Sequence, residues 1–294
     1  MATTAPDKFG ALILTHGRPD NQKTATALRR HGYTGPIVFV IDDEDNTADR
    51  YFKLYGDSVV QFSKQEYSKI IDECDNFTNR RSILYARNAS FDIAKQLGWT
   101  HFIQLDDDYG SFVWKFNRDL HYKEYYIKRL DHVFAALIRY LDRTDIASIA
   151  MAQGGDFIGG GVSRMANTLN VGTPFRRKAM NTFVCRTDRR VNFIARINED
   201  VTTYTRLGSI GRIFFTTNLC MVHQTETQTN PGGLTEFYLQ NGTYVKSFYS
   251  VICMPASVRI SAMSSNHARI HHKVIWRNTV PAILNERHCK RGKR

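Results

Sequence analysis

Three consecutive carboxylates, Asp106–Asp108, follow a short apolar run, and this feature most constrains how the chain folds. The run His101–Leu105 is apolar apart from one glutamine, which is typical of a strand covered on both faces. The preceding segment, Ser82–Leu97, has apolar residues near helical spacing, and Gly98 follows where a helix end favours glycine. A helix, a turn and a buried strand that ends in acids predict an α/β sheet with a ligand site at the strand's carboxyl end.

Adjacent carboxylates repel one another, so a compensating charge is expected near them. We interpret Asp106 and Asp108 as ligands of a divalent cation, because alternate side chains of a strand point the same way. Hard oxygen ligands favour Mg²⁺ or Mn²⁺, which also bind substrate diphosphates. The alternative is a solvated acidic turn or a helix N-cap. The buried strand and the helix before it favour the metal.

Two earlier segments repeat the pattern of a strand followed by polar residues. The first is Phe9–Thr15, which leads into a turn and a predicted helix over residues 21–31, and the second is Ile37–Ile41, which ends in the acids Asp42–Asp45. These acids could also form only a solvated turn. With a short third strand in Val59–Phe62, the order predicts an open, mostly parallel α/β sheet of Rossmann-like type flanked by helices.

The second half of the chain is expected to extend this sheet. A helix is predicted over Asp131–Leu141, and strands over Ile146–Met151, Asn181–Arg186, Ile213–Val222 and Lys246–Cys253, with Glu66–Asn79 as a loop or lid. The glycine cluster Gly154–Gly161 lacks the spacing of a dinucleotide fingerprint or a P-loop, so it is interpreted as a flexible substrate-side loop.

The charge balance favours a polyanionic partner. Forty Lys and Arg residues against 28 Asp and Glu residues give a net charge of +12 in 294 residues. Such an excess favours DNA or RNA first and an anionic membrane surface second, although a basic protein without such a partner is the alternative. Arg176–Lys178 form a local basic cluster that suits phosphates or a solvated loop.

Other features of the sequence bear on its surroundings. The five cysteines are odd in number and contain no CxxC, which predicts reduced thiols with neither a zinc site nor a disulfide framework. No apolar run approaches the roughly 18 residues of a membrane span, and the N-terminus lacks the layout of a signal peptide. These observations predict a cytoplasmic protein without a membrane partner. They leave its oligomeric state open.

The order "ARN…GWTHFIQLDDD" resembles the Asp-x-Asp region of GT-A-fold nucleotide-sugar glycosyltransferases. In that fold the aspartates hold a divalent metal against the donor diphosphate, the first strand end cradles the base and ribose, and the acid after the second strand often binds the base. The Arg and Asn of the preceding helix usually lie close to the nucleotide or the aspartates. The resemblance therefore implies these donor-binding residues: Thr15, Arg18, Asp42, Arg87, Asn88 and Asp107.

The resemblance also implies an acceptor-side acid and further ligands of the metal. In many GT-A enzymes a Glu-Asp pair before a helix lies near the acceptor hydroxyl and can take its proton, which here maps to Asp200 first and Glu199 second. The alternative is stabilisation of a helix start by the helix dipole. A C-terminal histidine that completes the metal shell maps to His271 or His272, with Lys273 on the diphosphate.

The stretches "TNPGGLTEFYLQNGTYVKSFYSV" and "RIHHKVIWRNTVP" resemble the TET/JBP-associated glycosyltransferases, found mainly in phages. The resemblance spans about residues 9–284. It implies one GT-A-like domain with a nucleotide-sugar half near 9–150, an acceptor half near 151–285 and a basic tail at 286–294. If the chain is phage-encoded, its location would be the host cytoplasm.

The implied reaction moves a sugar, glucose in the first instance, from a UDP-sugar to 5-hydroxymethylcytosine or a related base in DNA, with Mn²⁺ or Mg²⁺. Two alternatives stay open at this point. One is a glycosyltransferase with a polysaccharide or lipid acceptor, and the other is a non-catalytic nucleic-acid-binding module on a degenerate transferase fold.

Overall fold

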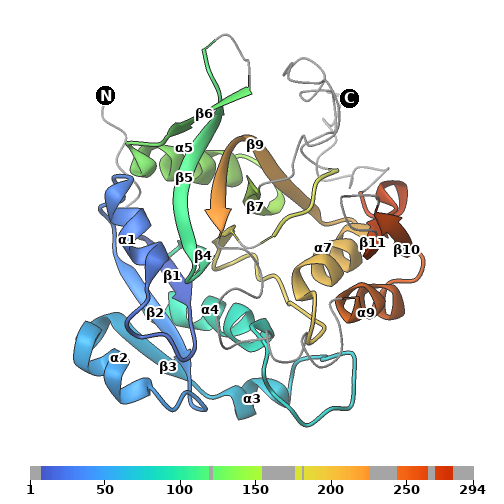
Figure 1. The fold of residues 1–294 in the computed structure, drawn as a ribbon, viewed down its shortest axis with the longest axis horizontal. Coiled ribbons are helices and arrows are strands. Elements are labelled where there is room, and N and C mark those ends of the chain that lie inside the picture. Colours follow the sequence, from blue (N-terminus) through green and yellow to red (C-terminus); the bar gives the residue numbers. More distant parts are fainter. Residues whose placement is uncertain are drawn as a thin grey trace, which may run out of the picture.

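The computed structural model describes residues 8–118, 122–153, 176–180, 182–224, 244–263 and 269–280. Its strands are β1 (Phe9–Leu14), β2 (Ile37–Asp42), β3 (Val59–Phe62), β4 (His101–Asp106), β5 (Tyr109–Phe116), β6 (Tyr122–Tyr126), β7 (Ile146–Gln153), β8 (Phe183–Arg186), β9 (Ile213–Gln224), β10 (Val258–Met263) and β11 (Arg269–Val274). Its helices are α1 (Lys23–Arg30), α2 (Ala48–Tyr55), α3 (Lys64–Ser68), α4 (Leu84–Gln96), α5 (Leu130–Asp142), α7 (Glu199–Ser209) and α9 (Val245–Cys253), with 3₁₀ turns η1 (Gly56–Ser58) and η3 (Trp276–Asn278). Figure 1 shows their arrangement.

Nine of the described strands form one sheet in the order β3-β2-β1-β4-β8-β7-β9-β5-β6, and β10 and β11 form a separate pair. The first four strands run parallel, with Leu14 of β1 opposite Asp106 of β4. Their carboxyl ends therefore lie along one edge of the sheet. The α/β class and the parallel first half are confirmed.

The rest of the sheet is mixed in direction. Strand β8 runs antiparallel to both β4 and β7, β9 runs parallel to β7, and β5 and β6 close the far edge as antiparallel strands. Strands β8, β7 and β9 thus lie between β4 and β5, which are consecutive in sequence. Residues before and after position 150 therefore share one sheet.

Helices cover both faces of the sheet because the strands alternate their buried side chains. In β1, Phe9, Ala11 and Ile13 pack with side chains of α1, α2 and α5 on one face. Leu12 and Leu14 point the other way, into a second core with side chains of α4 and α7. Helix α4 thus lies behind β1 and β4, and α7 comes close to the end of β4.

Two sequence predictions about local structure were wrong. Lys246–Cys253 was expected to be a strand, but Val245–Cys253 is helix α9. Its aromatic and β-branched residues favour a strand locally, yet the helix places Ser250 against Asn198 at the start of α7, with 2.5 Å between Oγ and Nδ2. The strand alternation invoked for Asp106 and Asp108 also fails, because β4 ends at Asp106 and the next two residues form a turn into β5.

Several predicted features lie outside the described residues. They are the glycine cluster at 154–161, residue 181, the stretch at 225–243 and the tail at 281–294, which includes Cys289. In the described part, Cys74, Cys185, Cys220 and Cys253 are free thiols. Among the helices described, none has the length and apolarity that crossing a membrane requires.

Candidate active site

The ends of β1 and β4 bring three predicted donor-binding residues together. Because β1 and β4 are parallel neighbours in register, Thr15 and Asp107 follow adjacent strand ends. The Thr15 hydroxyl donates to Asp107 Oδ2 at 2.7 Å, and Arg18 Nη1 donates to Asp107 Oδ1 at 2.9 Å. The Asp107 carboxylate is therefore held by the β1 turn, and Arg18 keeps a partly exposed side chain beside it.

Asp42 lies at the next strand end and is already paired. Its Oδ2 lies 2.8 Å from His16 Nδ1, and its Oδ1 lies 3.0 Å from the ammonium of Lys64. Burial raises the pKa of Asp42, but the His16 hydrogen bond and the Lys64 charge outweigh it, so the pKa is lower than usual. Lys64 was missed by the sequence reasoning, since a lone lysine in a polar segment carries no signal.

Arg87 on α4 joins the end of β4 to the start of α7. Its side chain is 1% exposed. Nη2 lies 3.2 Å from Asp106 Oδ1, and Nε donates to Glu199 Oε1 at 2.8 Å. Two acids that are far apart in sequence are therefore fixed on one planar cation. Arg87 lies beside the aspartates, as predicted.

Unlike Arg87, Asn88 uses its side chain to bind backbone groups. Its Nδ2 donates to the carbonyls of Leu84 and Phe193, both at 3.0 Å, and its Oδ1 accepts from the Phe193 amide at 3.1 Å. These bonds tie α4 to the segment that leads to α7. The predicted contact of Asn88 with the donor stays a prediction.

The acids around Arg87 carry more negative charge than the cations beside them. Burial raises the pKa of Asp106 to about 7 against the lowering effect of Arg87, and the charges of Asp108, Glu199 and Asp107 raise it further. Burial and the charge of Asp107 raise the pKa of Asp108. A bound divalent cation would relieve this repulsion, and carboxylate oxygens are the ligand type that Mn²⁺ and Mg²⁺ prefer, so Asp106 and Asp108 stay the predicted metal ligands.

Asp200 and Glu199 lie in the first turn of α7, as both interpretations of this pair require. Burial and the charge of Glu199 raise the pKa of Asp200, against the lowering effects of Arg87 and Lys178. Asp200 Oδ1 also accepts from the Val201 amide at 2.7 Å. Glu199 is therefore part of the Arg87 cluster, which we define as Arg87, Asp106 and Glu199, while Asp200 stabilises the helix start.

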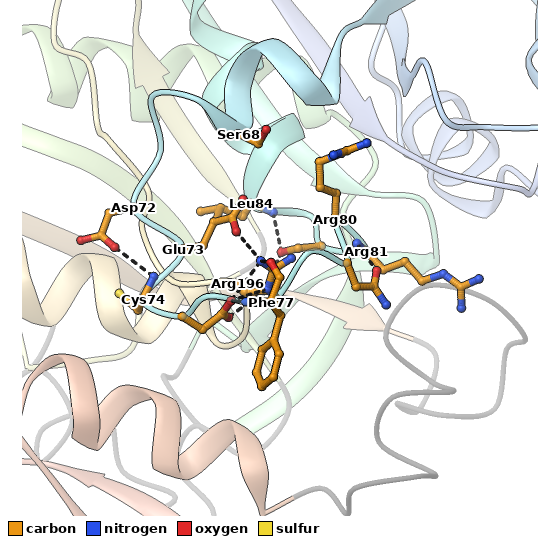
Figure 2. A network of polar contacts seen from close by, with 12 residues as sticks. Ser68, Asp72, Glu73, Cys74, Phe77, Arg80, Arg81, Leu84 and Arg196 are labelled. Carbon is orange, nitrogen blue, oxygen red and sulfur yellow. Dashed lines mark hydrogen bonds and ion pairs between the residues drawn. The ribbon is translucent and has the colours of Figure 1, made fainter.

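Hydrogen bonds and ion pairs around Arg196 hold the segment before α7 in place (Figure 2). The amides of Ala195 and Arg196 each donate at 2.9 Å, to the carbonyls of Asp72 and Glu73. The buried Arg196 side chain pairs with Glu73 and with Asp75, whose Oδ2 lies 2.9 Å from Nε. We name Arg196, Glu73 and Asp75 the Arg196 clamp. Nothing local in the sequence distinguished Arg196 from other arginines, because its partners are about 120 residues away.

The C-terminal histidines lie next to Lys178. The Lys178 ammonium is 2.7 Å from His272 Nε2 and 3.2 Å from His271 Nε2. Burial, and then the charges of Lys178, His271 and Lys246, lower the pKa of His272 to about 2, so its imidazole is neutral. The sequence singled out Lys178 only as part of a basic cluster.

The predicted metal and diphosphate roles of this C-terminal strand stay predictions. In the part of the chain that the structure describes, no three His, Cys, Asp or Glu side chains form a group spaced to hold a metal ion. Lys273 is exposed and follows the buried His272, so the two side chains leave β11 on opposite faces.

The family model described as TET-associated glycosyltransferase matches residues 10–233, more than two thirds of the chain. The chain belongs to the TET-associated glycosyltransferase family. The coarse function that follows is glycosyl transfer. Within this TET-associated glycosyltransferase, the matched region contains the strand-end carboxylates, Arg87 and the Glu199–Asp200 pair, whereas His271, His272 and Lys273 lie beyond it.

No curated protein matches the chain. Solved structures with a partial likeness include glucosyl-3-phosphoglycerate synthase from Mycobacterium tuberculosis in complex with Mn²⁺, UDP and phosphoglyceric acid. It is 11% identical with a TM-score of 0.43, and the match covers 91% of this chain and 87% of that one. The same enzyme with Mn²⁺ and UDP-glucose is 10% identical with a TM-score of 0.42, covering 91% and 86%.

Proposed function

We propose that this TET-associated glycosyltransferase moves glucose from UDP-glucose to the hydroxymethyl group of a modified pyrimidine, 5-hydroxymethylcytosine in the first instance, in DNA. The observation that carries the proposal is the Arg87 cluster, in which one buried cation holds Asp106 at the β4 end and Glu199 at the α7 start. The carboxylates that we propose for metal binding and for the acceptor side are thereby held on one side chain.

The residues around the cluster suit distinct parts of such a reaction. A cation held by Asp106 and Asp108 would neutralise the charge of the departing diphosphate. Thr15 and Arg18 position the Asp107 carboxylate at the donor side of the same edge. Asp42, kept ionised by its neighbours, lies at the β2 end where a donor base or ribose would be bound.

Asp200 is proposed as the acceptor-side base. Its raised pKa makes the ionised carboxylate a better proton acceptor than an exposed aspartate. It takes the proton of the acceptor hydroxyl while that oxygen bonds to C1 of the sugar, and the bond from C1 to the diphosphate breaks to release UDP. Glu199, bound to Arg87, holds the cluster in position and is the second candidate.

The DNA acceptor is supported by family resemblance and by charge. A net charge of +12 favours a polyanionic substrate. A target base in a duplex has to be turned out of the stack, at a cost of a few kcal/mol, before its hydroxymethyl group reaches a buried carboxylate.

The test is sugar-nucleotide turnover with Mn²⁺ on paired duplexes that differ only in cytosine or 5-hydroxymethylcytosine. UDP release and the mass of the base are measured for the wild type, for Asp106→Asn, Asp108→Asn and Asp200→Asn, and for Asp57→Asn as an exposed control. We expect a hexose on the modified base, lost in the three site variants, retained in the control and abolished by EDTA.

Each other outcome identifies which part of the proposed function is wrong. UDP release without an adduct on DNA would support a glycosyltransferase whose acceptor is a polysaccharide or a lipid carrier instead of DNA. No UDP release with any donor, together with DNA binding, would leave a nucleic-acid-binding module. Full activity of Asp106→Asn in the presence of EDTA would refute the metal role.

A further inference from the structure

Strand β6 presents aromatic side chains to solvent at the edge of the large sheet. All five of its residues are exposed, including Tyr122, Tyr125 and Tyr126, and Tyr126 is 70% exposed. Trp114 on the neighbouring strand β5 is 39% exposed. Proteins usually blunt an edge strand with charge or cover it, and a cluster of exposed rings marks a binding surface. Because neighbouring residues of a strand point to opposite faces, Tyr125 shares a face with Lys123 and with its register partner Trp114, whereas Tyr122 and Tyr126 point to the other face. We name Trp114, Lys123 and Tyr125 the hairpin aromatic surface.

The pairing of β5 with β6 keeps the Trp114 and Tyr125 rings close to one another and to a cation. Trp114 lies directly opposite Tyr125 in the strand register. The Lys123 ammonium lies 5.5 Å from the centre of the Tyr125 ring. Rings with adjacent ammonium groups can contact a base and its phosphate at the same time.

The charge of the hairpin is also suited to a polyanion. Between positions 114 and 129 the exposed basic residues that the structure describes are Arg118, Lys123, Lys128 and Arg129, and the described acid is Glu124. Glu124 accepts a hydrogen bond from the Tyr122 hydroxyl, and its other oxygen lies 2.8 Å from His223 Nε2. Its charge is therefore partly engaged, and the surface as a whole is basic.

The hairpin aromatic surface lies away from the strand-end carboxylates, and strand β5 joins the two. Strand β5 begins immediately after Asp108, and Trp114 is six residues further along, roughly 20 Å at the rise of a strand. In Figure 1 the β5–β6 hairpin projects from the body of the molecule on the side away from α3. If the target base lies at the carboxylates, the nucleotide about six positions along the same DNA strand would lie at this distance.

We propose that the hairpin aromatic surface is a second DNA contact, at which Trp114 and Tyr125 stack on unpaired bases while Lys123 contacts a phosphate. This inference rests on the proposed DNA acceptor and deepens it. The site would take DNA with an unpaired stretch in preference to a fully paired duplex, because stacking on a side chain requires an open base face. It contributes affinity and placement, and takes no part in the chemistry.

The test measures binding separately from sugar transfer. Fluorescence anisotropy gives the Kd for a labelled, unmodified duplex that contains a short unpaired stretch, for the wild type, Trp114→Ala and Tyr125→Ala. Tyr140→Ala, an exposed tyrosine on α5, is the matched control. We expect each hairpin variant to raise Kd roughly 5- to 150-fold, as for loss of one stacked base, and the control to leave it unchanged. Lys123→Gln should lower the slope of log K against log salt by about 0.7–0.9.

Transfer to a free hydroxymethylated nucleoside is the second readout. Wild-type rates in the hairpin variants, together with weakened DNA binding, support the inference. Unchanged DNA binding in both Trp114→Ala and Tyr125→Ala overturns it even if glucosylation of DNA is established. So does a concentration-dependent dimer, seen by light scattering, that Tyr125→Ala abolishes without affecting DNA binding. DNA binding that depends on the hairpin, without any sugar transfer, leaves this inference standing and refutes the proposed function.

Discussion

The Arg196 clamp offers a sharp test of how the segment before α7 is held. Replacing Arg196 with methionine keeps the length of the side chain but removes its charge and its donors. Glu73 and Asp75 would remain mostly buried, with side chains 14% and 9% exposed, and would lose their cation. The carbonyl of Phe77, which accepts from Arg196 Nη2 at 2.8 Å, would also lose its donor.

The expected loss of stability follows from leaving two buried carboxylates without their partner. Removing one member of a buried ion pair costs about 3–5 kcal/mol. For a domain of this size each kcal/mol lowers Tm by about 2–4 °C, so we expect Tm to fall by roughly 6–20 °C. Arg50→Met is the matched control, because the Arg50–Asp20 pair is exposed on both sides and should change Tm little.

The loss of stability in Arg196→Met should depend on pH. Burial raises the pKa of Asp75, but hydrogen bonds from Arg196, the Phe77 amide and Tyr249 outweigh it and hold the pKa below its usual range. A lowered pKa stabilises the folded state above the unfolded value of about 4, and the stabilisation is lost as pH falls through the folded value. The difference in Tm between wild type and Arg196→Met should therefore be full near neutral pH and shrink below about pH 4.

Differential scanning calorimetry across this range, with UDP release measured at neutral pH, is the assay. Because the clamp fixes the chain just before Glu199 and Asp200, we expect kcat to fall more than donor KM rises. A Tm within about 2 °C of wild type at neutral pH would contradict the energetic reasoning. A lowered Tm with unchanged kcat would show that the clamp stabilises the fold without positioning the acids.

Three further changes test other parts of the structure. Arg87→Lys keeps the charge but cannot reach both of its acids, so kcat should fall about 10²-fold, with Glu199→Gln as a comparison in the same UDP-release assay. Lys178→Met removes a positive charge that lowers the pKa of Asp200, the proposed base, and should shift the acidic limb of the activity profile toward higher pH, measured from pH 5 to 9. Gly208→Ala would place a Cβ 1.9 Å from the Thr279 carbonyl oxygen, and should lower the free energy of unfolding in urea by about 1–3 kcal/mol.

The sequence was informative where the signal is local. Each predicted strand of the first half is an apolar run of four to seven residues, bounded by polar turns, and Phe9–Leu14, Ile37–Asp42 and His101–Asp106 form strands within one residue of the expected limits. The acids that follow these runs therefore lie at one sheet edge, because parallel strands share their direction.

Local patterns failed where long-range packing decides. The segment Val245–Cys253 has residues that suit a strand, but its contact with the start of α7 selects a helix. The hairpin strands β5 and β6 were also missed, because their exposed aromatic and charged residues give no clear apolar alternation.

The sequence by itself determined the α/β class, the strand-end acids and the helix that carries Arg87, because each depends on residues close together in the chain. Only the tertiary structure decided what these residues contact. Arg87 and Glu199 are separated by 112 positions, and Lys178 and His272 by 94. Such pairs depend on how β8, β7 and β9 enter the sheet between β4 and β5, and on the burial that makes an unpaired charge costly. Neither property is encoded in the spacing of neighbouring residues.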